Sequence, residues 1–270
     1  MSRLRHSIVG SALLLATLPA PRLANAAGTL LRYHFVDGQT LTYRGAVTTA
    51  SAASVGGKAL PTPSDTMTYL VHYGFSHITE GGGAALTMRT DHIVDRLTQG
   101  GKTMRATPPA STAQFQQQLD GSQYGPDGVH HGAYGNGDLG QLTMGSVAVG
   151  DHWMTSLTDR TAIFGPNAVM TCRNTLAGFA RAPVRAADIQ TACSIAGHAA
   201  PTVGGRRYRF MASDSLSGRW RFDVANGRFL AEALRDTVTE TGTVSDARGV
   251  HPFSQRTTQT YTQQLVSVQG

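Results

Sequence analysis

The stretch GRWRFDVANGRFLAEAL, residues 218–234, carries the strongest local fold signal in the chain. Its Asn226-Gly227 pair is a preferred two-residue hairpin turn, because both positions tolerate a positive φ angle. A two-residue loop places apolar partners on one face: Val224 with Phe229, Phe222 with Ala231 and Trp220 with Ala233. The other face then sets Arg221 opposite Glu232. One register gives an apolar face and an opposite-charge pair, which predicts an antiparallel hairpin.

The same period-two alternation recurs along the chain, in segments rich in Thr, Val, Tyr and Phe that Gly, Asn and Asp punctuate. The further strands expected are residues 30–36, 40–47, 67–75, 84–97, 168–180, 185–198 and 257–266. A three-residue loop at 37–39 would join the first two as a hairpin, with Phe35 opposite Leu41 and Tyr33 opposite Tyr43. We therefore predict a mainly all-β fold, an antiparallel curved sheet or half-barrel with at most one or two short helices.

The chain has two cysteines, Cys172 and Cys193. If residues 181–184 form a turn, the flanking strands bring these cysteines directly opposite each other, within reach of a bond. The alternative is two reduced cysteines at core positions. Because the register and the expected compartment agree, we predict a structural disulfide.

Residues 1–26 have the order of a secretory signal peptide. Arg3 and Arg5 form a basic start, residues 8–18 an apolar run, and Ala24-Asn25-Ala26 a site for signal peptidase. An apolar run of about 11–13 residues is too short for a membrane anchor, which needs roughly 20. We predict cleavage after this leader and export to the periplasm or the medium, with no integral membrane segment and a single β-rich domain over 27–270.

Removal of the leader takes away three arginines and no acid, so the net charge falls from +6 to +3. This mild charge argues against nucleic acid as a partner, since such proteins need a clustered basic face. The one basic cluster, Arg206-Arg207-Tyr208-Arg209, is interpreted as a solvated strand face. Anionic lipid or polysaccharide is the alternative partner for it.

Residues 108–142 break the strand pattern and are expected to form a long loop or insertion, with a short helix at 111–119. Residues 135–140 match G-x-G-x-x-G but lack the flanking strand and helix of a dinucleotide site. His130 and His131 are the best metal ligands in this loop, yet adjacent side chains on a strand point apart. The sequence predicts no cofactor and no metal here.

The chain carries no recognised catalytic motif. No G-x-S-x-G occurs, although a spatial arrangement of Ser, His and Asp stays open. The acid pairs Asp91 with Asp95 and Glu232 with Asp236 are interpreted as solvent-facing strand charges. Trp153 and Trp220 are interpreted as structural aromatics on sheet faces. We therefore predict no catalytic residues.

Three segments together resemble a broad group of exported bacterial β-rich proteins: GQTLTY at 38–43, VGDHW at 149–153, and GRWRFD with GRF at 218–229. The resemblance implies a half-barrel similar to that of periplasmic lipoprotein carriers, a fold that often binds lipid-like ligands. It implies no catalytic residue. The expected function is therefore non-catalytic, with a lipid or other apolar molecule bound in a sheet groove. The alternative is a cell-envelope hydrolase with its site near 108–142.

Overall fold

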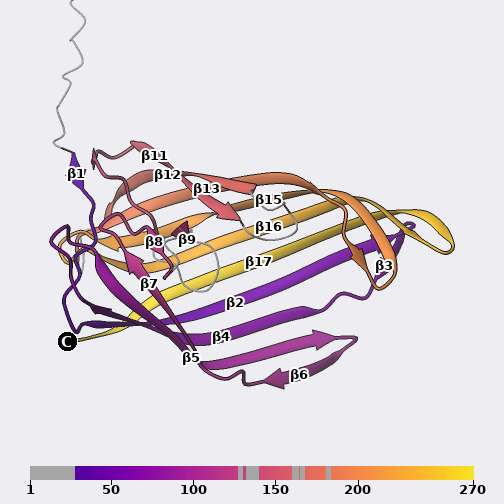
Figure 1. Cartoon of the computed structure of the whole chain (residues 1–270), viewed down its shortest axis with the longest axis horizontal. Coiled ribbons are helices and arrows are strands. Elements are labelled where there is room, and N and C mark those ends of the chain that lie inside the picture. The colour runs from indigo at the N-terminus through magenta and orange to yellow at the C-terminus, as the bar shows by residue number, and fades with distance from the viewer. Residues whose placement is uncertain (1–27, 127–129, 132–139, 160–163, 165–167, 181–183) are drawn as a thin grey trace, which may run out of the picture.

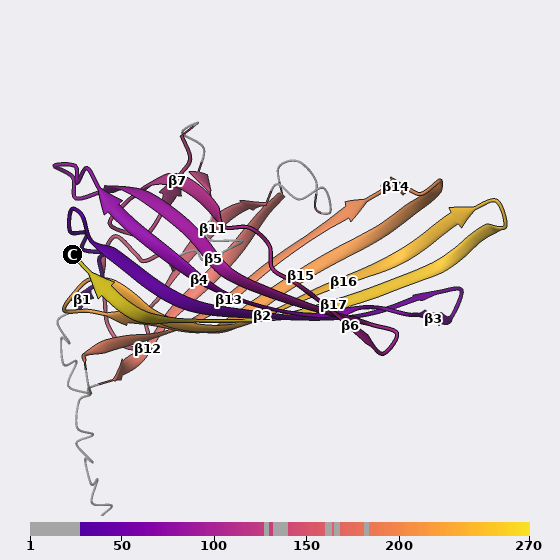
Figure 2. The ribbon, with the colours of Figure 1, turned by 90° about the horizontal axis from the view of Figure 1, so that it is seen from below.

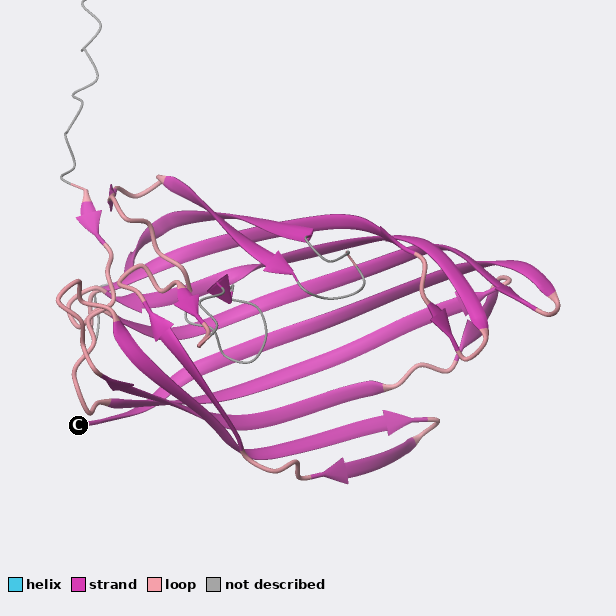
Figure 3. Cartoon of the chain, in the orientation of Figure 1, coloured by secondary structure: helices cyan, strands magenta, loops and turns pink. Residues whose placement is uncertain are grey.

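The computed structural model describes residues 28–126, 130–131, 140–159, 164, 168–180 and 184–270. This part of the chain consists of strands, turns and loops and contains no helix (Figure 3). Its strands form one fifteen-stranded antiparallel sheet and a separate two-stranded one. The predicted all-β antiparallel fold is thus confirmed. The described residues also include no helix that could cross a membrane, and the predicted leader lies outside them.

The strands follow one another along the chain with these bounds: β1 Thr29–Leu30, β2 Thr40–Val55, β3 Lys58–Leu60, β4 Ser64–Ser76, β5 Ala84–Gln99, β6 Lys102–Ala106, β7 Ser111–Gln117, β8 Gln123–Tyr124, β9 His130–His131, β10 Ser146–Val147, β11 His152–Asp159, β12 Ala168–Ala180, β13 Ala186–Ala199, β14 Thr202–Val203, β15 Arg206–Asp223, β16 Arg228–Asp246 and β17 Gly249–Gln269. Twelve strands of the large sheet have the order β11-β12-β13-β15-β16-β17-β2-β4-β5-β7-β8-β9, and the other three pair off this path, β14 with β15, β3 with β2 and β6 with β5. The last strand, β17, therefore joins the two halves of the chain.

The sheet curls at one end and continues as an open, curved sheet at the other (Figures 1 and 2). We call the curled end the cup. Its core contains Tyr43, Tyr73, Phe222 and Phe229, all fully buried. We call the sheet face that carries these side chains the inner face. The open half is the part of β15, β16, β17 and β2 that extends beyond Trp220, away from the cup.

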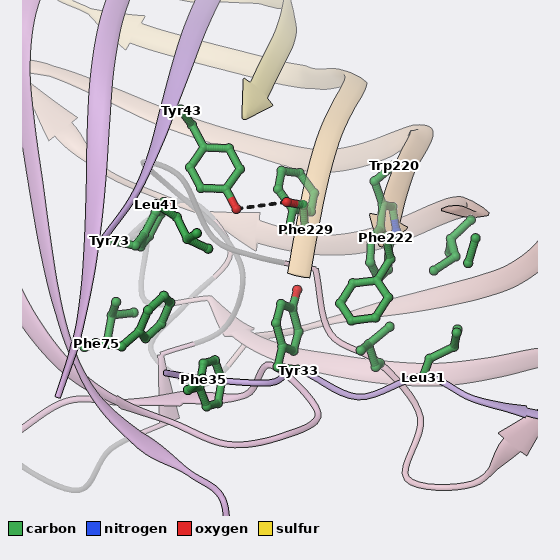
Figure 4. Packing of buried hydrophobic residues seen from close by; sticks show 14 of the residues in the cluster. Leu31, Tyr33, Phe35, Leu41, Tyr43, Tyr73, Phe75, Trp220, Phe222 and Phe229 are labelled. Carbon is green, nitrogen blue, oxygen red and sulfur yellow. Dashed lines mark hydrogen bonds between the residues drawn. The ribbon is translucent and has the colours of Figure 1, made fainter. Parts of the chain in front are cut away.

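The chain's own N-terminal segment fills the cup. Leu31, Tyr33 and Phe35 point into the core, and the Tyr33 ring packs edge-on against Phe222 (Figure 4). The Tyr33 backbone N–H donates to the carbonyl of Leu119 at 2.8 Å. The predicted hairpin of residues 30–36 with 40–47 is therefore wrong, because β2 pairs with β17 and β4 instead.

The hairpin of β15 and β16 forms, but its loop is longer than predicted. Asp223 pairs with Arg228, so the loop comprises residues 224–227. The Asp223 carboxylate accepts hydrogen bonds from the backbone N–H groups of Ala225 and Asn226, both at 3.1 Å. It also lies 3.3 Å from the Arg228 guanidinium. Because these contacts stabilise the buried Asp223 carboxylate, the hairpin has a four-residue loop instead of the predicted two-residue loop.

The longer loop and a bulge at Arg221–Phe222 change which residues share a face. Glu232 lies opposite Trp220 and so faces inward, whereas the sequence placed it outside, opposite Arg221. Arg221 instead donates to Asp188 of β13 at 2.9 Å. Gly227 keeps the positive φ expected of a turn, and its carbonyl accepts the His34 N–H at 2.8 Å.

The predicted helix at 111–119 is wrong, because residues 111–117 form strand β7 on the edge of β5. Ala113, Phe115 and Gln117 are the more buried residues of this strand, which is period-two burial. Pairing with the free edge of β5 overrides the helix propensity of glutamine.

The predicted disulfide is confirmed: Cys172 of β12 lies opposite Cys193 of β13 and is bonded to it. The strands end at the pair Ala180 and Ala186, so the turn is one residue longer than predicted. The register shifts between Leu176 and Gly178, and this bulge restores the predicted pairing at the cysteines. Both sulfurs belong to a second, smaller core on the inner face, together with Met170, Ile195 and Leu216.

Candidate functional site

The border between the cup and the open half is one row of side chains on the inner face. Neighbouring strands β15, β16, β17, β2 and β4 contribute, in this order, Trp220, Glu232, Gln263, Gly45 and Tyr69. The Tyr69 ring occupies the space that a side chain at position 45 would need, since a Cβ there would lie 2.2 Å from the ring. The absence of a side chain at Gly45 thus lets the Tyr69 ring lean toward Gln263.

Beyond this row, the inner face of β16 alternates acidic and apolar side chains. Every second residue faces inward, which gives the series Glu232, Leu234, Asp236, Val238 and Glu240. Asp236 is only 5% exposed, and Glu240 is also buried. Four residues along a strand span about 13 Å, so the three acids are evenly spaced over about 27 Å.

The neighbouring strands add to this surface. β15 contributes Asp214, which is buried on the same face. Among the described inward-facing residues of β15, β16, β17 and β2 from the border row to Phe253, none is an arginine or a lysine. Buried carboxylates normally have a cationic partner, because an isolated buried charge is costly. The three acids of β16 therefore face no arginine or lysine among the described inward-facing residues of these four strands.

Apolar side chains separate and flank the acids. Leu234, Val238 and Phe210 pack against the core that contains the disulfide, and Val47 and Met67 pack against the core of the cup. All five are only partly buried. The open half thus offers apolar contacts and carboxylates on the same face.

Burial and repulsion between like charges raise the pKa of several groups on the inner face. Burial raises the pKa of Glu232 from 4.5 to about 7. Burial, together with the charge of Glu232, raises the pKa of Tyr69 to about 12. The pKa of Tyr261 is raised by burial and then by the charges of Asp236 and Asp214. These groups therefore share one electrostatic environment, in which negative charge accumulates.

Two further carboxyls, Asp65 of β4 and Asp95 of β5, lie on the same face. A hydrogen bond to Asp95, burial and the charge of Asp95 all raise the pKa of Asp65. Asp65 therefore retains its proton more readily than an isolated carboxyl does. Asp95 was interpreted as a solvent-facing charge, as were Glu232 and Asp236, yet all three face inward because bulges shift the register of β5 and of β15 with β16.

The outer face carries the opposite charge. Arg207 and Arg209 of the predicted basic cluster are exposed there, and Arg219 and Arg221 lie on the same side of β15. Asp188, Gln190, Arg219 and Arg221 line a shallow groove of about 550 Å³. Small residues of β12 and β16 also line it: Ala177, Gly178, Ala231 and Ala233.

The two tryptophans are buried and engaged. Trp220 donates its Nε1–H to Thr191 at 2.9 Å, and Thr191 donates to Asn174 at 2.6 Å. Trp153 donates to the carbonyl of Gln141 at 3.1 Å. The indole N–H of each tryptophan thus has a hydrogen-bond acceptor within the protein, and we interpret both rings as structural.

A hydroxyl–imidazole–carboxylate chain occurs on the outer face and was not found from the sequence, since its members come from three strands. Thr42 Oγ1 lies 3.0 Å from His72 Nδ1, and His72 Nε2 lies 3.2 Å from Asp91 Oδ1. Hydrogen bonds from His92 and His72 lower the pKa of Asp91. The atoms follow the order of a nucleophile, base and acid. However, Thr42 is only 7% exposed, so we interpret the chain as a structural network.

Residues 127–129 and 132–139 of the segment expected to hold a site, 108–142, lie outside the described residues. His130 and His131 form β9 and pair with β8, and residues 135–139 of the glycine-rich motif are not described. Gly140 packs against the Trp220 ring, because a Cβ there would lie 2.9 Å from it. Within the described ranges, no three His, Cys, Asp or Glu side chains gather closely enough to hold a metal ion.

No protein-family model matches the chain, and no curated protein matches its sequence.

Proposed function

We propose that this is an exported, non-catalytic binding protein that holds an elongated, mainly apolar ligand along the inner face of the open half. The observation that carries the proposal is the inner face of β16, where apolar and acidic side chains alternate on partly buried positions. A surface that only contacted water would not gain from burying carboxylates beside leucine and valine. A ligand with an apolar chain would cover the apolar positions.

Because the cup is filled, the proposed binding surface lies in the open half. Tyr33 and Phe35 occupy the cup. The inner face outside the cup runs from Glu232 and Gln263 along β16 and β17. A ligand that lay parallel to these strands would contact their inward-facing side chains in succession. This proposal agrees with the expected likeness to half-barrel lipoprotein carriers.

Export is part of the same proposal. The leader pattern at residues 1–26 and the buried Cys172–Cys193 disulfide both suit an oxidising compartment. A binding protein in the periplasm or the medium would act on molecules outside the cytoplasm.

The test is native mass spectrometry of the mature protein, purified without detergent from cells that export it. We expect a second species with the mass of a bound small molecule. A matched pair of substitutions separates the faces: Thr257 faces inward and contacts Ser51 at 3.0 Å, whereas Thr258 faces outward. Thr257→Tyr is expected to abolish the adduct, and Thr258→Tyr to leave it unchanged. An adduct that survives Thr257→Tyr, or a wild-type protein that is always empty, would refute the proposal.

A further inference from the structure

We propose that the inner face recognises a linear diamine or polyamine, a chain of methylene groups that carries ammonium groups, through Glu232, Asp236 and Gln263. This inference rests on the proposed binding function and specifies the chemistry of its ligand.

Gln263 is the observation that points to a ligand. Its side chain is 2% exposed, yet neither its amide oxygen nor its amide nitrogen has a hydrogen-bond partner in the described part of the protein. It lies directly opposite Glu232 on the inner face. A buried amide without partners is unfavourable, so native proteins rarely leave one unsatisfied. A hydrogen-bond donor of a ligand at this position would satisfy the amide oxygen.

The charge of that group follows from the atoms that surround it. Asp236 Oδ1 is buried and also has no hydrogen-bond partner among the described residues. Carboxylate and amide oxygens are acceptors, and an ammonium group offers three donors and no acceptor. A positive ligand group would also offset the desolvation of Glu232 and Asp236, which no lysine or arginine on the inward-facing side of β15, β16, β17 and β2 does. Recognition by this face therefore requires a cation.

The spacing favours a linear organic cation over a metal ion. Metal binding requires several ligands around one point, and the described side chains provide no such group. Glu232 and Asp236 are about 13 Å apart along β16, with Leu234 between them. Ammonium groups separated by a methylene chain would meet the acids in turn and place the chain on the leucine.

The aromatic rings fit the same ligand. Tyr69 leans over Gly45 beside Gln263, and Tyr261 lies next to Leu234 on the adjacent strand. An ammonium group near the face of a tyrosine ring is stabilised by the cation–π interaction. The rings also offer apolar area for the methylene chain.

The experiment is isothermal titration calorimetry of the mature protein, at about pH 8, with four probes of one chain length. Decanediamine carries two ammonium groups, decylamine one, decanediol none, and decanedioate two carboxylates. We expect decanediamine to bind about tenfold or more tightly than each of the others, because every ammonium–carboxylate contact contributes at least that factor.

The variants assign the effect to the proposed residues. Glu232→Gln and Asp236→Asn are each expected to weaken decanediamine about tenfold and to leave decanediol unchanged. Asp188→Asn removes the same charge from the outer face and is expected to have no effect. Circular dichroism confirms that each variant is folded, and either inner-face variant alone is sufficient for the test.

The outcomes separate this inference from the proposed function. If all four probes bind equally and the acid variants change nothing, the cationic specificity is wrong and binding of apolar chains stands. If decylamine equals decanediamine, the assignment to a diamine is wrong. If no probe binds, both proposals fail.

Discussion

At the scale of single residues, Glu232 shows how one bulge determines the chemistry of a side chain. With a two-residue loop it would be an exposed strand charge opposite Arg221. With the observed loop it faces inward beside Trp220 and Gln263. Burial then raises its pKa to about 7, so its charge changes within the physiological range.

This shift predicts how stability depends on pH. Because the folded protein holds the Glu232 proton more tightly than the unfolded chain, the free energy of unfolding falls as the pH rises from about 4.5 to about 7. Its contribution to the fall is at most about 3 kcal/mol. Glu232→Gln removes the ionisable group, so it should raise stability at about pH 8 and leave it unchanged at about pH 4.

Urea unfolding of the ligand-free protein at both pH values measures this effect. Asp188→Asn is the control, because its exposed ion pair with Arg221 should change stability by less than about 1 kcal/mol. A loss of stability in Glu232→Gln at both pH values would show that the carboxylate is satisfied in the folded state.

At the scale of elements, the sequence predicted strands well where period-two burial decided the register alone. The β12–β13 pair illustrates this, since Cys172 and Cys193 face each other as expected. The β15–β16 register was not predictable from alternation, because the Asp223 side chain selects the loop. Because the predicted register was wrong, Glu232 and Asp236 were assigned to the outer face. The alternation of acidic and apolar residues from Glu232 to Glu240 is visible in the sequence.

The N-terminal segment is the element whose role the sequence did not indicate. Its alternation of buried and exposed residues was correct, but alternation cannot distinguish a hairpin strand from an extended segment inside a curved sheet. Tyr33 has both a packing and a polar role there, since its hydroxyl donates to the carbonyl of Gly140 at 2.8 Å. The segment therefore stabilises the cup that positions the border row.

We expect Tyr33→Ala to lower the free energy of unfolding by about 3–5 kcal/mol, the range for a large buried aromatic. Tyr33→Phe keeps the ring and loses one hydrogen bond, so about 1 kcal/mol is expected. Val36→Ala changes an exposed residue of the same segment and should cost less than about 0.5 kcal/mol. Denaturant unfolding of the three variants checks this order, and equal effects for Tyr33→Ala and Val36→Ala would contradict the packing described.

At the scale of the whole molecule, the two faces of one sheet differ in charge and in burial. The inner face of the open half carries carboxylates, amides and apolar side chains, and the outer face carries arginines and small hydroxyl residues. The chain's own N-terminal segment fills one end of the curved sheet, and we propose that a ligand binds along the inner face of the other half. The position of the binding surface is therefore the central claim.

Methyl-detected nuclear magnetic resonance of the mature protein, titrated with decanediamine, tests that claim most directly. We predict shifts of the methyl signals of Leu234, Val238 and Val47 on the inner face, and none for Ala233 and Met211 on the outer face. Shifts confined to Ala233 and Met211, or unchanged spectra at saturating ligand, would contradict it.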